Sequence, residues 1–242
     1  MSLFLVKSLD SAVVLFLVGL FVALLFVEPF VGLIIYFTLL YIRPHEFIPV
    51  LATARLMLVI GGGTLGSMIL RRAFEGRAVR LFHTPTDKIL WCFFLSVVLS
   101  HLSHADIDSA VRSALSVGTL VAVYFLITNL VNSEKKLSVV VNVLGFLTII
   151  LAVQGIVQFH TGAGIGGQTV MDEGRIRSLG GFANPNALAM ALLVGLPFLL
   201  FDLGRFRKLP FRVYSAAGVI IILYGLYLTN SRGAMLGLGG MV

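Results

Sequence analysis

The chain has 242 residues, of which 58% are hydrophobic and only 12% are charged, and its mean hydropathy is +1.02. Soluble domains are about 45–50% apolar and about 25% charged, so this composition excludes a soluble globular protein. The formal net charge is +7. Because the basic residues lie in short loops between apolar runs, they indicate membrane topology and argue against a nucleic-acid partner.

Long apolar runs follow one another along the whole chain. A helix needs roughly 20 apolar residues to cross a hydrocarbon core about 30 Å thick, and several runs reach or approach that length. No segment alternates as membrane barrel strands do, so we expect an all-α, polytopic transmembrane helical bundle, one domain over residues 1–242 with about 8–9 membrane segments. The runs are residues 11–27, 29–42, 51–70, 88–102, 111–131, 137–159, 185–203, 212–228, and a ninth from residue 233.

The two ends of the chain carry further signals. Glu28 and Pro29 interrupt the first apolar stretch, and we expect a helix break there because proline ends a helix and a charge prefers water. The first run continues far beyond the core of a signal peptide, which predicts a retained anchor. The last run stops at Val242 without a polar tail, and we interpret the chain as the N-terminal part of a longer protein.

The distribution of lysine and arginine indicates on which side of the membrane each loop lies. Three loops carry eleven of these residues, and the loops that alternate with them carry six. By the positive-inside rule the first set is cytoplasmic and the second periplasmic, in the inner membrane of a bacterium. The cytoplasmic set is residues 71–88, 135–136 and 205–212, and the periplasmic set is residues 43–55, 101–112, 160–184 and 229–232.

Two polar segments on the expected periplasmic side hold the candidate site. Asn184-Pro185 should begin a helix, with Asn184 as its N-cap, and the free backbone N–H groups of such a start suit a phosphate. Arg232 follows Thr229-Asn230-Ser231 between two apolar runs, where a guanidinium can bind phosphate through two parallel hydrogen bonds. Plain helix capping by Asn184 and snorkelling by Arg232 are the structural alternatives.

The sequence predicts neither a metal site nor a cofactor. His101, His104, Asp106 and Asp108 lie close together, but their spacing fits no zinc pattern and favours a hydrated turn. The chain has no phosphate-loop lysine motif, no dinucleotide fingerprint and no nucleophile elbow, which argues against nucleotide chemistry.

Two motifs together resemble the O-antigen ligase and O-antigen polymerase-related membrane proteins. They are Arg-Ser-Leu-Gly-Gly-Phe-Ala-Asn-Pro-Asn-Ala-Leu-Ala, residues 177–189, and Leu-Thr-Asn-Ser-Arg-Gly-Ala, residues 228–234. The segments Glu-Pro-Phe-Val-Gly-Leu and Tyr-Ile-Arg-Pro-His-Glu-Phe, within residues 28–47, are similar to the branch described as O-glycosylation ligases. The resemblance covers most of the chain.

This resemblance implies a glycosyltransferase of lipopolysaccharide and polysaccharide biosynthesis. Such a ligase moves a glycan from an undecaprenyl pyrophosphate carrier to a hydroxyl of an acceptor lipid, glycan or protein at the periplasmic face. By resemblance, Arg232 with Ser231 would hold the pyrophosphate, and Arg177 with Asn184 and Asn186 would line the same region. The family's general-base histidine lies in a periplasmic loop beyond Val242, so the catalytic residue is unassigned and we expect this chain alone to be inactive.

Two alternatives stay open at this stage. An O-antigen polymerase shares the same motifs, so the resemblance does not separate it from a ligase. A transporter or lipid flippase without bond chemistry would need polar residues in mid-membrane and inverted repeats. The polar clusters of this sequence lie instead on one expected face, and we find no convincing repeat.

Overall fold

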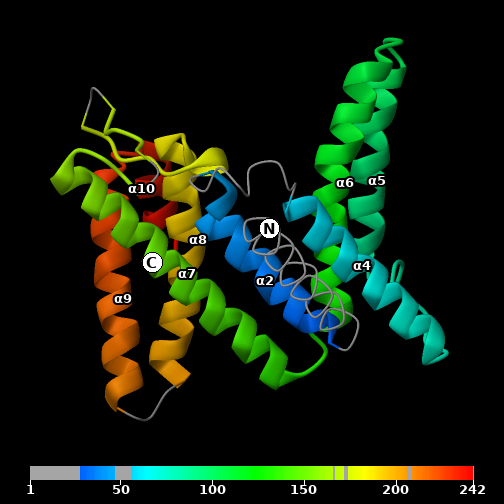
Figure 1. Cartoon of the computed structure of the whole chain (residues 1–242), viewed down its shortest axis with the longest axis horizontal. Helices are drawn as coiled ribbons and strands as arrows, with labels where there is room; N and C mark the ends of the chain where they lie inside the picture. The colour runs from blue at the N-terminus through cyan, green and yellow to red at the C-terminus, as the bar shows by residue number, and fades with distance from the viewer. Residues whose placement is uncertain (1–27, 47–55, 166, 172–173, 206–208, 242) are drawn as a thin grey trace, which may run out of the picture. The chain divides into compact units, whose positions relative to one another are not determined.

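The computed structural model describes residues 28–46, 56–165, 167–171, 174–205 and 209–241. This part of the chain is helical and contains no strand, as the composition predicts (Figure 1). Five of its helices are long and apolar enough to cross a membrane. They are α4 (Leu56–Phe74), α6 (Ile107–Leu130), α7 (Glu134–Thr161), α8 (Pro185–Arg205) and α9 (Leu209–Leu228).

The predicted count of 8–9 membrane segments is larger than these five. Helix α2 (Pro29–Ile42) is apolar but has only 14 residues, and α10 (Arg232–Gly239) has eight. Helix α5 (Pro85–Leu102) has 18 residues and is not among the five, and its first turn contains Thr86, Asp87 and Lys88. The predicted run at residues 11–27 lies outside the described residues. Helix α2 begins at Pro29, the position at which the predicted break places a helix start.

The chain divides into two compact units, Met1–Ile35 with Leu58–Ser133 and Tyr36–Met57 with Glu134–Val242. In the first unit, α5 and α6 pack as an antiparallel hairpin (Figure 1). Asp87 accepts hydrogen bonds from the backbone N–H groups of His83 and Thr84, both at 2.8 Å, and from the hydroxyl of Tyr124 at 2.7 Å. This carboxylate therefore caps α5 and links it to α6.

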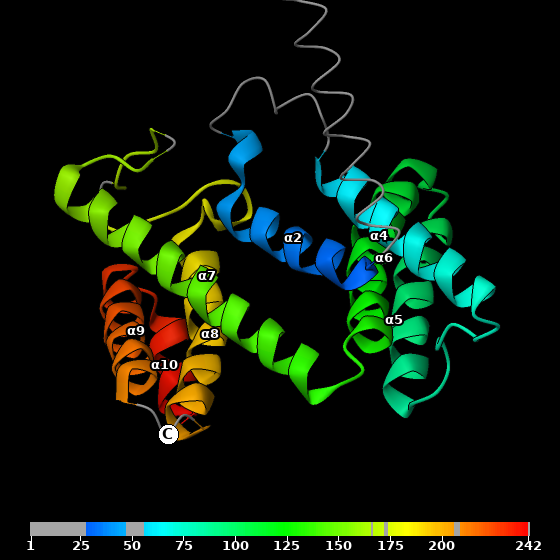
Figure 2. The same cartoon turned by 60° about the horizontal axis from the view of Figure 1, so that its bottom comes forward.

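The second unit packs α7, α8 and α9 against one another, and α10 lies against α8 (Figure 2). Gly195 of α8 allows one close approach, because a Cβ atom there would lie 2.2 Å from Oγ1 of Thr148 on α7. Small residues at such contacts are typical of membrane helices. The buried core contains Leu151 and Ala152 of α7, Leu188, Leu192, Leu196 and Leu199 of α8, Ile222 and Leu226 of α9, and Ala234 of α10.

Candidate functional site

The turn between α9 and α10 forms one wall of the candidate site. Asn230 has a φ of 48°, a left-handed conformation that asparagine adopts more readily than most residues and that reverses the chain here. Ser231 is the N-cap of α10, and its hydroxyl accepts a hydrogen bond from the N–H of Ala234 at 3.4 Å. Thr229 is buried, and its hydroxyl donates to the carbonyl of Leu226. The polar segment of residues 229–232, between two apolar runs, is therefore the ordered start of α10.

Arg175 reaches this turn from the loop that precedes α8. Its Nε donates to the carbonyl oxygen of Thr229 at 2.9 Å, and its Nη2 donates to Oδ1 of Asn186 at 2.9 Å. The next residue, Ile176, is fully buried, and its backbone N–H bonds the carbonyl of Leu228 at 3.3 Å. Burial of Ile176 fixes the loop, and the two hydrogen bonds fix the guanidinium of Arg175.

The start of α8 forms the other wall. The helix begins at Pro185, and Oδ1 of Asn184 accepts a hydrogen bond from the backbone N–H of Asn186 at 2.8 Å. The carbonyl of Asn184 accepts the helical bond from Leu188. The predicted N-cap and first helical residue are thus confirmed. The side chain of Asn184 is therefore engaged in capping, whereas the exposed side chain of Asn186 accepts the hydrogen bond from Arg175.

These elements line an open cavity of about 490 Å³. Two of the described lining residues are arginines and none is acidic, so the cavity carries positive charge. The first amides of α10 add the positive end of a helix, which attracts anions. Gly233 keeps this end open, since nothing lies within 4 Å of the place a Cβ atom would take. The lining residues are Arg175, Asn186, Met190, Asn230, Ser231, Arg232, Gly233 and Ala234.

The structure brings together three of the five residues predicted from the sequence. Asn186, Ser231 and Arg232 line the cavity, although Asn186 lies 45 positions before Ser231 in the sequence. Asn184 stands beside them as the cap of α8. Arg177 makes other contacts: its backbone N–H donates to Oε1 of buried Gln158 at 2.9 Å, and its Nε donates to the carbonyl of Thr169 at 3.0 Å.

Sequence reasoning did not select Arg175, which lines the cavity. The resemblance favoured Arg177 instead, and two arginines two positions apart in an irregular loop cannot be distinguished by spacing. The available signal was Ile176, an apolar residue between two arginines in a polar loop. Such a residue indicates an anchoring point, but it does not say which neighbouring arginine meets the α9–α10 turn.

The exposed guanidinium of Arg232, the fixed guanidinium of Arg175 and the N-terminal amides of α10 can together bind a ligand with several negative oxygens. A diphosphate group has this chemistry. Comparison with protein-family models, with curated proteins and with solved structures finds no match to this chain.

Proposed function

We propose that this protein transfers a glycan from an undecaprenyl pyrophosphate carrier to an acceptor hydroxyl at the periplasmic face of a bacterial inner membrane. The proposal is an O-antigen ligase type of glycosyltransferase, or a polymerase that uses the same donor, in a bundle of about 8–9 transmembrane segments. The observation that carries it is the cavity lined by Arg175, Arg232 and the start of α10, with no acidic residue among its described lining.

The proposed reaction depends on stabilising the negative charge that develops on the leaving pyrophosphate. The acceptor oxygen forms a bond to the anomeric carbon while the bond from that carbon to the pyrophosphate oxygen breaks, and a base removes the acceptor proton. Undecaprenyl pyrophosphate leaves with one additional negative charge. Preorganised donors that face this charge lower the barrier, and this is the role we give to Arg175, Arg232 and the amides of α10.

The two arginines have different parts in this proposal. Arg175 is held by Thr229 and Asn186 before any ligand arrives, so it contributes a fixed positive charge. Arg232 is exposed at the cavity and is available to grip phosphate oxygens with two parallel hydrogen bonds. The acceptor, whether lipid, glycan or protein, meets the anomeric carbon outside this diphosphate subsite.

Glycan transfer by arginine variants tests the proposal. Arg232→Lys keeps the charge but loses the planar fork, and loss of a charged hydrogen bond of about 1.5–3 kcal/mol should slow transfer roughly ten- to a hundredfold. Transfer is measured in membrane vesicles with a lipid pyrophosphate-linked glycan, with each protein in its natural full-length form and at equal membrane levels. Arg212→Lys on α9, exposed and outside the cavity lining, is the matched control and should transfer normally. Wild-type transfer by Arg232→Ala would remove this arginine from the donor site.

A further inference from the structure

The first unit contains a second cavity, of about 410 Å³, with a different character. It is lined by apolar side chains of α4, α5 and α6 and by the segment that joins α4 to α5. Every described lining residue is hydrophobic or glycine, so a charged or strongly polar ligand would lose its hydration there without replacement. The lining residues are Leu65, Met68, Ile69, Val79, Leu81, Trp91, Phe94, Gly118, Val121, Ala122 and Phe125.

One end of this cavity is polar. Asn129 stands one helical turn after the lining residue Phe125, and Arg72 stands one turn after Met68. The guanidinium of Arg72 donates to the carbonyls of Asn129, at 3.0 Å, and of Ala78, at 2.7 Å. Arg80 lies between the lining residues Val79 and Leu81 in the chain.

Buried Asn129 fixes Arg80 by its main chain. Oδ1 of Asn129 accepts from the N–H of Arg80 at 2.9 Å, and Nδ2 donates to the carbonyl of Arg80 at 3.1 Å. The backbone of Arg80 is thereby held between two lining residues of the cavity, and its side chain is exposed to the surroundings.

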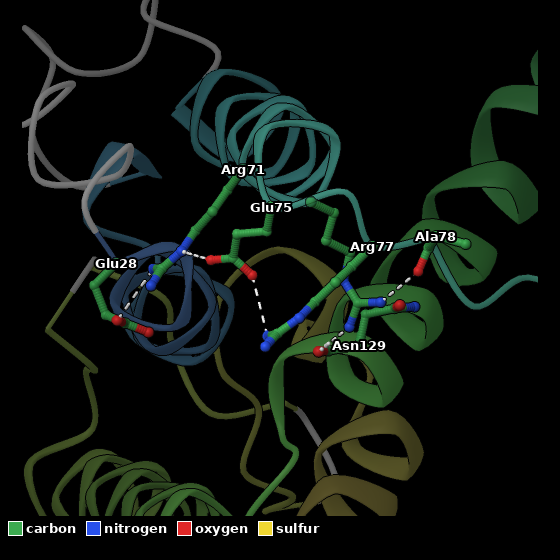
Figure 3. A network of polar contacts seen from close by, with 7 residues as sticks. Glu28, Arg71, Glu75, Arg77, Ala78 and Asn129 are labelled. Carbon is green, nitrogen blue, oxygen red and sulfur yellow. Dashed lines mark hydrogen bonds and ion pairs between the residues drawn. The ribbon is translucent and has the colours of Figure 1, made fainter.

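Carboxylates balance only part of the positive charge at this end. Arg71 pairs with Glu28 at 3.3 Å and Glu75 at 3.0 Å, and Arg77 pairs with Glu75 at 3.1 Å (Figure 3). The hydrogen bonds described for Arg72 go to neutral carbonyl oxygens. Residues 71–88 contain five basic and two acidic side chains, so the polar end keeps a positive charge.

Trp91 indicates that the polar end of this cavity lies near the lipid head groups. Its indole N–H donates to the carbonyl of Leu81 at 3.2 Å, and its ring stacks on Phe82 and Phe125 with centroid distances of 5.9 and 5.6 Å. Tryptophan is enriched where hydrocarbon meets the polar head groups, and it presents an apolar body with one polar edge.

We propose that this cavity binds an anionic phospholipid, independently of the donor cavity in the other unit. One acyl chain fills the apolar space between α4, α5 and α6, and the phosphate of the head group lies against Arg80 and Arg72. The charge of the head group selects the lipid. A neutral lipid would fill the acyl-chain site equally well but would bring no net negative charge to Arg72, whose described hydrogen bonds go to neutral carbonyls, or to Arg80. Basic pockets between membrane helices are known to take anionic head groups in this manner.

Native mass spectrometry of the purified 242-residue chain tests the proposal. The chain is offered phosphatidylglycerol and phosphatidylcholine with identical acyl chains at equal concentration. We expect preferential retention of phosphatidylglycerol, and a roughly fivefold loss of its binding in Arg80→Gln. Lys135→Gln, which removes one exposed basic charge from the first turns of α7, is the matched control and should retain phosphatidylglycerol as the wild type does.

A substitution in the apolar lining tests the acyl-chain site separately from the head-group site. Ala122→Phe places a ring in the cavity and should lower retention of both lipids, whereas Arg80→Gln should lower only phosphatidylglycerol. Soluble glycerol phosphate, which lacks an acyl chain, should not displace the bound lipid. Equal retention of the two lipids by the wild type, or unchanged phosphatidylglycerol binding in Arg80→Gln, would overturn the proposal.

Discussion

Asn184 and Asn186 lie two positions apart but make different contacts. Oδ1 of Asn184 caps α8, and Oδ1 of Asn186 accepts a hydrogen bond from Arg175 at the cavity. The sequence predicts the cap well, because Asn-Pro before an apolar run is a helix-start signal. It does not predict the contact between Asn186 and Arg175, because that contact depends on how the loop folds over Ile176.

The same substitution should impair transfer at Asn186 but not at Asn184. Asn186→Asp would form an ion pair with Arg175 and place a negative charge in the proposed diphosphate subsite, so we expect transfer to fall roughly tenfold or more. Asn184→Asp keeps an oxygen that caps α8 about as well as asparagine does, so transfer should stay near the wild-type rate. Transfer assays at equal protein levels compare them, and an unimpaired Asn186→Asp would argue against an anion in this cavity.

Asp87 gives a prediction for pH dependence. The backbone N–H of Thr84 and the hydroxyl of Tyr124 stabilise its carboxylate and lower its pKa to about 2. A carboxylate with a lowered pKa contributes stability that is complete above its ordinary pKa of about 3.9 and is lost as the pH falls toward about 2. Thermal unfolding between pH 5 and pH 2 should therefore show this loss in the wild type and not in Asp87→Asn.

At neutral pH, Asp87→Asn should also lower the unfolding midpoint by about 2–4 °C, the scale of one lost hydrogen bond in a chain of this size. The carboxylate accepts through both of its oxygens, and the amide has only one oxygen that can accept. Asp108→Asn, in the first turn of α6, is the control because no hydrogen bond is described for that carboxylate. Equal midpoints for the wild type and Asp87→Asn would mean that Asp87 does not join α5 to α6.

At the level of elements, the apolar runs located the helices but misplaced several of their ends. The run predicted from residue 88 begins earlier as a helix, at Pro85, and the run predicted from residue 111 begins at Ile107. Both starts are polar turns closed by the side-chain caps Thr84 and Asp106, and polar caps lie outside an apolar run by their nature.

Glycine contacts between α7 and α8 could not be read from the sequence, since a glycine that faces lipid looks the same as one that faces a neighbouring helix. Gly195→Ala should destabilise the chain by about 1–3 kcal/mol, because the added methyl group would overlap Thr148. Gly204→Ala on the same helix meets nothing within 4 Å and should have no effect or stabilise slightly. Thermal unfolding in detergent compares the two, and equal midpoints would contradict the close packing of α7 and α8.

At the scale of the whole molecule, composition was enough to predict helices that can cross a membrane, and five described helices meet that expectation. The division into two compact units was not predictable, because apolar runs carry no information about which helices pack together. The orientation in the membrane remains a prediction from charge, with residues 71–88 cytoplasmic and residues 160–184 periplasmic.

Single cysteines test this orientation. Because Cys92 is exposed, it is first replaced by alanine. Ile165→Cys and His83→Cys then place a thiol at an exposed position in each loop. A membrane-impermeant maleimide applied to intact spheroplasts should label position 165 and not position 83, and the reverse pattern would invert the topology.

The central claim is that the cavity between the start of α8 and the α9–α10 turn binds a diphosphate. Binding of undecaprenyl pyrophosphate and of undecaprenyl monophosphate to this chain in nanodiscs tests it most directly, because the two lipids differ only by one phosphate group. We predict that the wild type binds the pyrophosphate more tightly than the monophosphate. The ratio of the two affinities should fall roughly tenfold in Arg175→Gln and in Arg232→Gln, and it should stay unchanged in Arg212→Gln. Equal affinity for the two lipids in the wild type, or an unchanged preference in both cavity variants, would contradict the account.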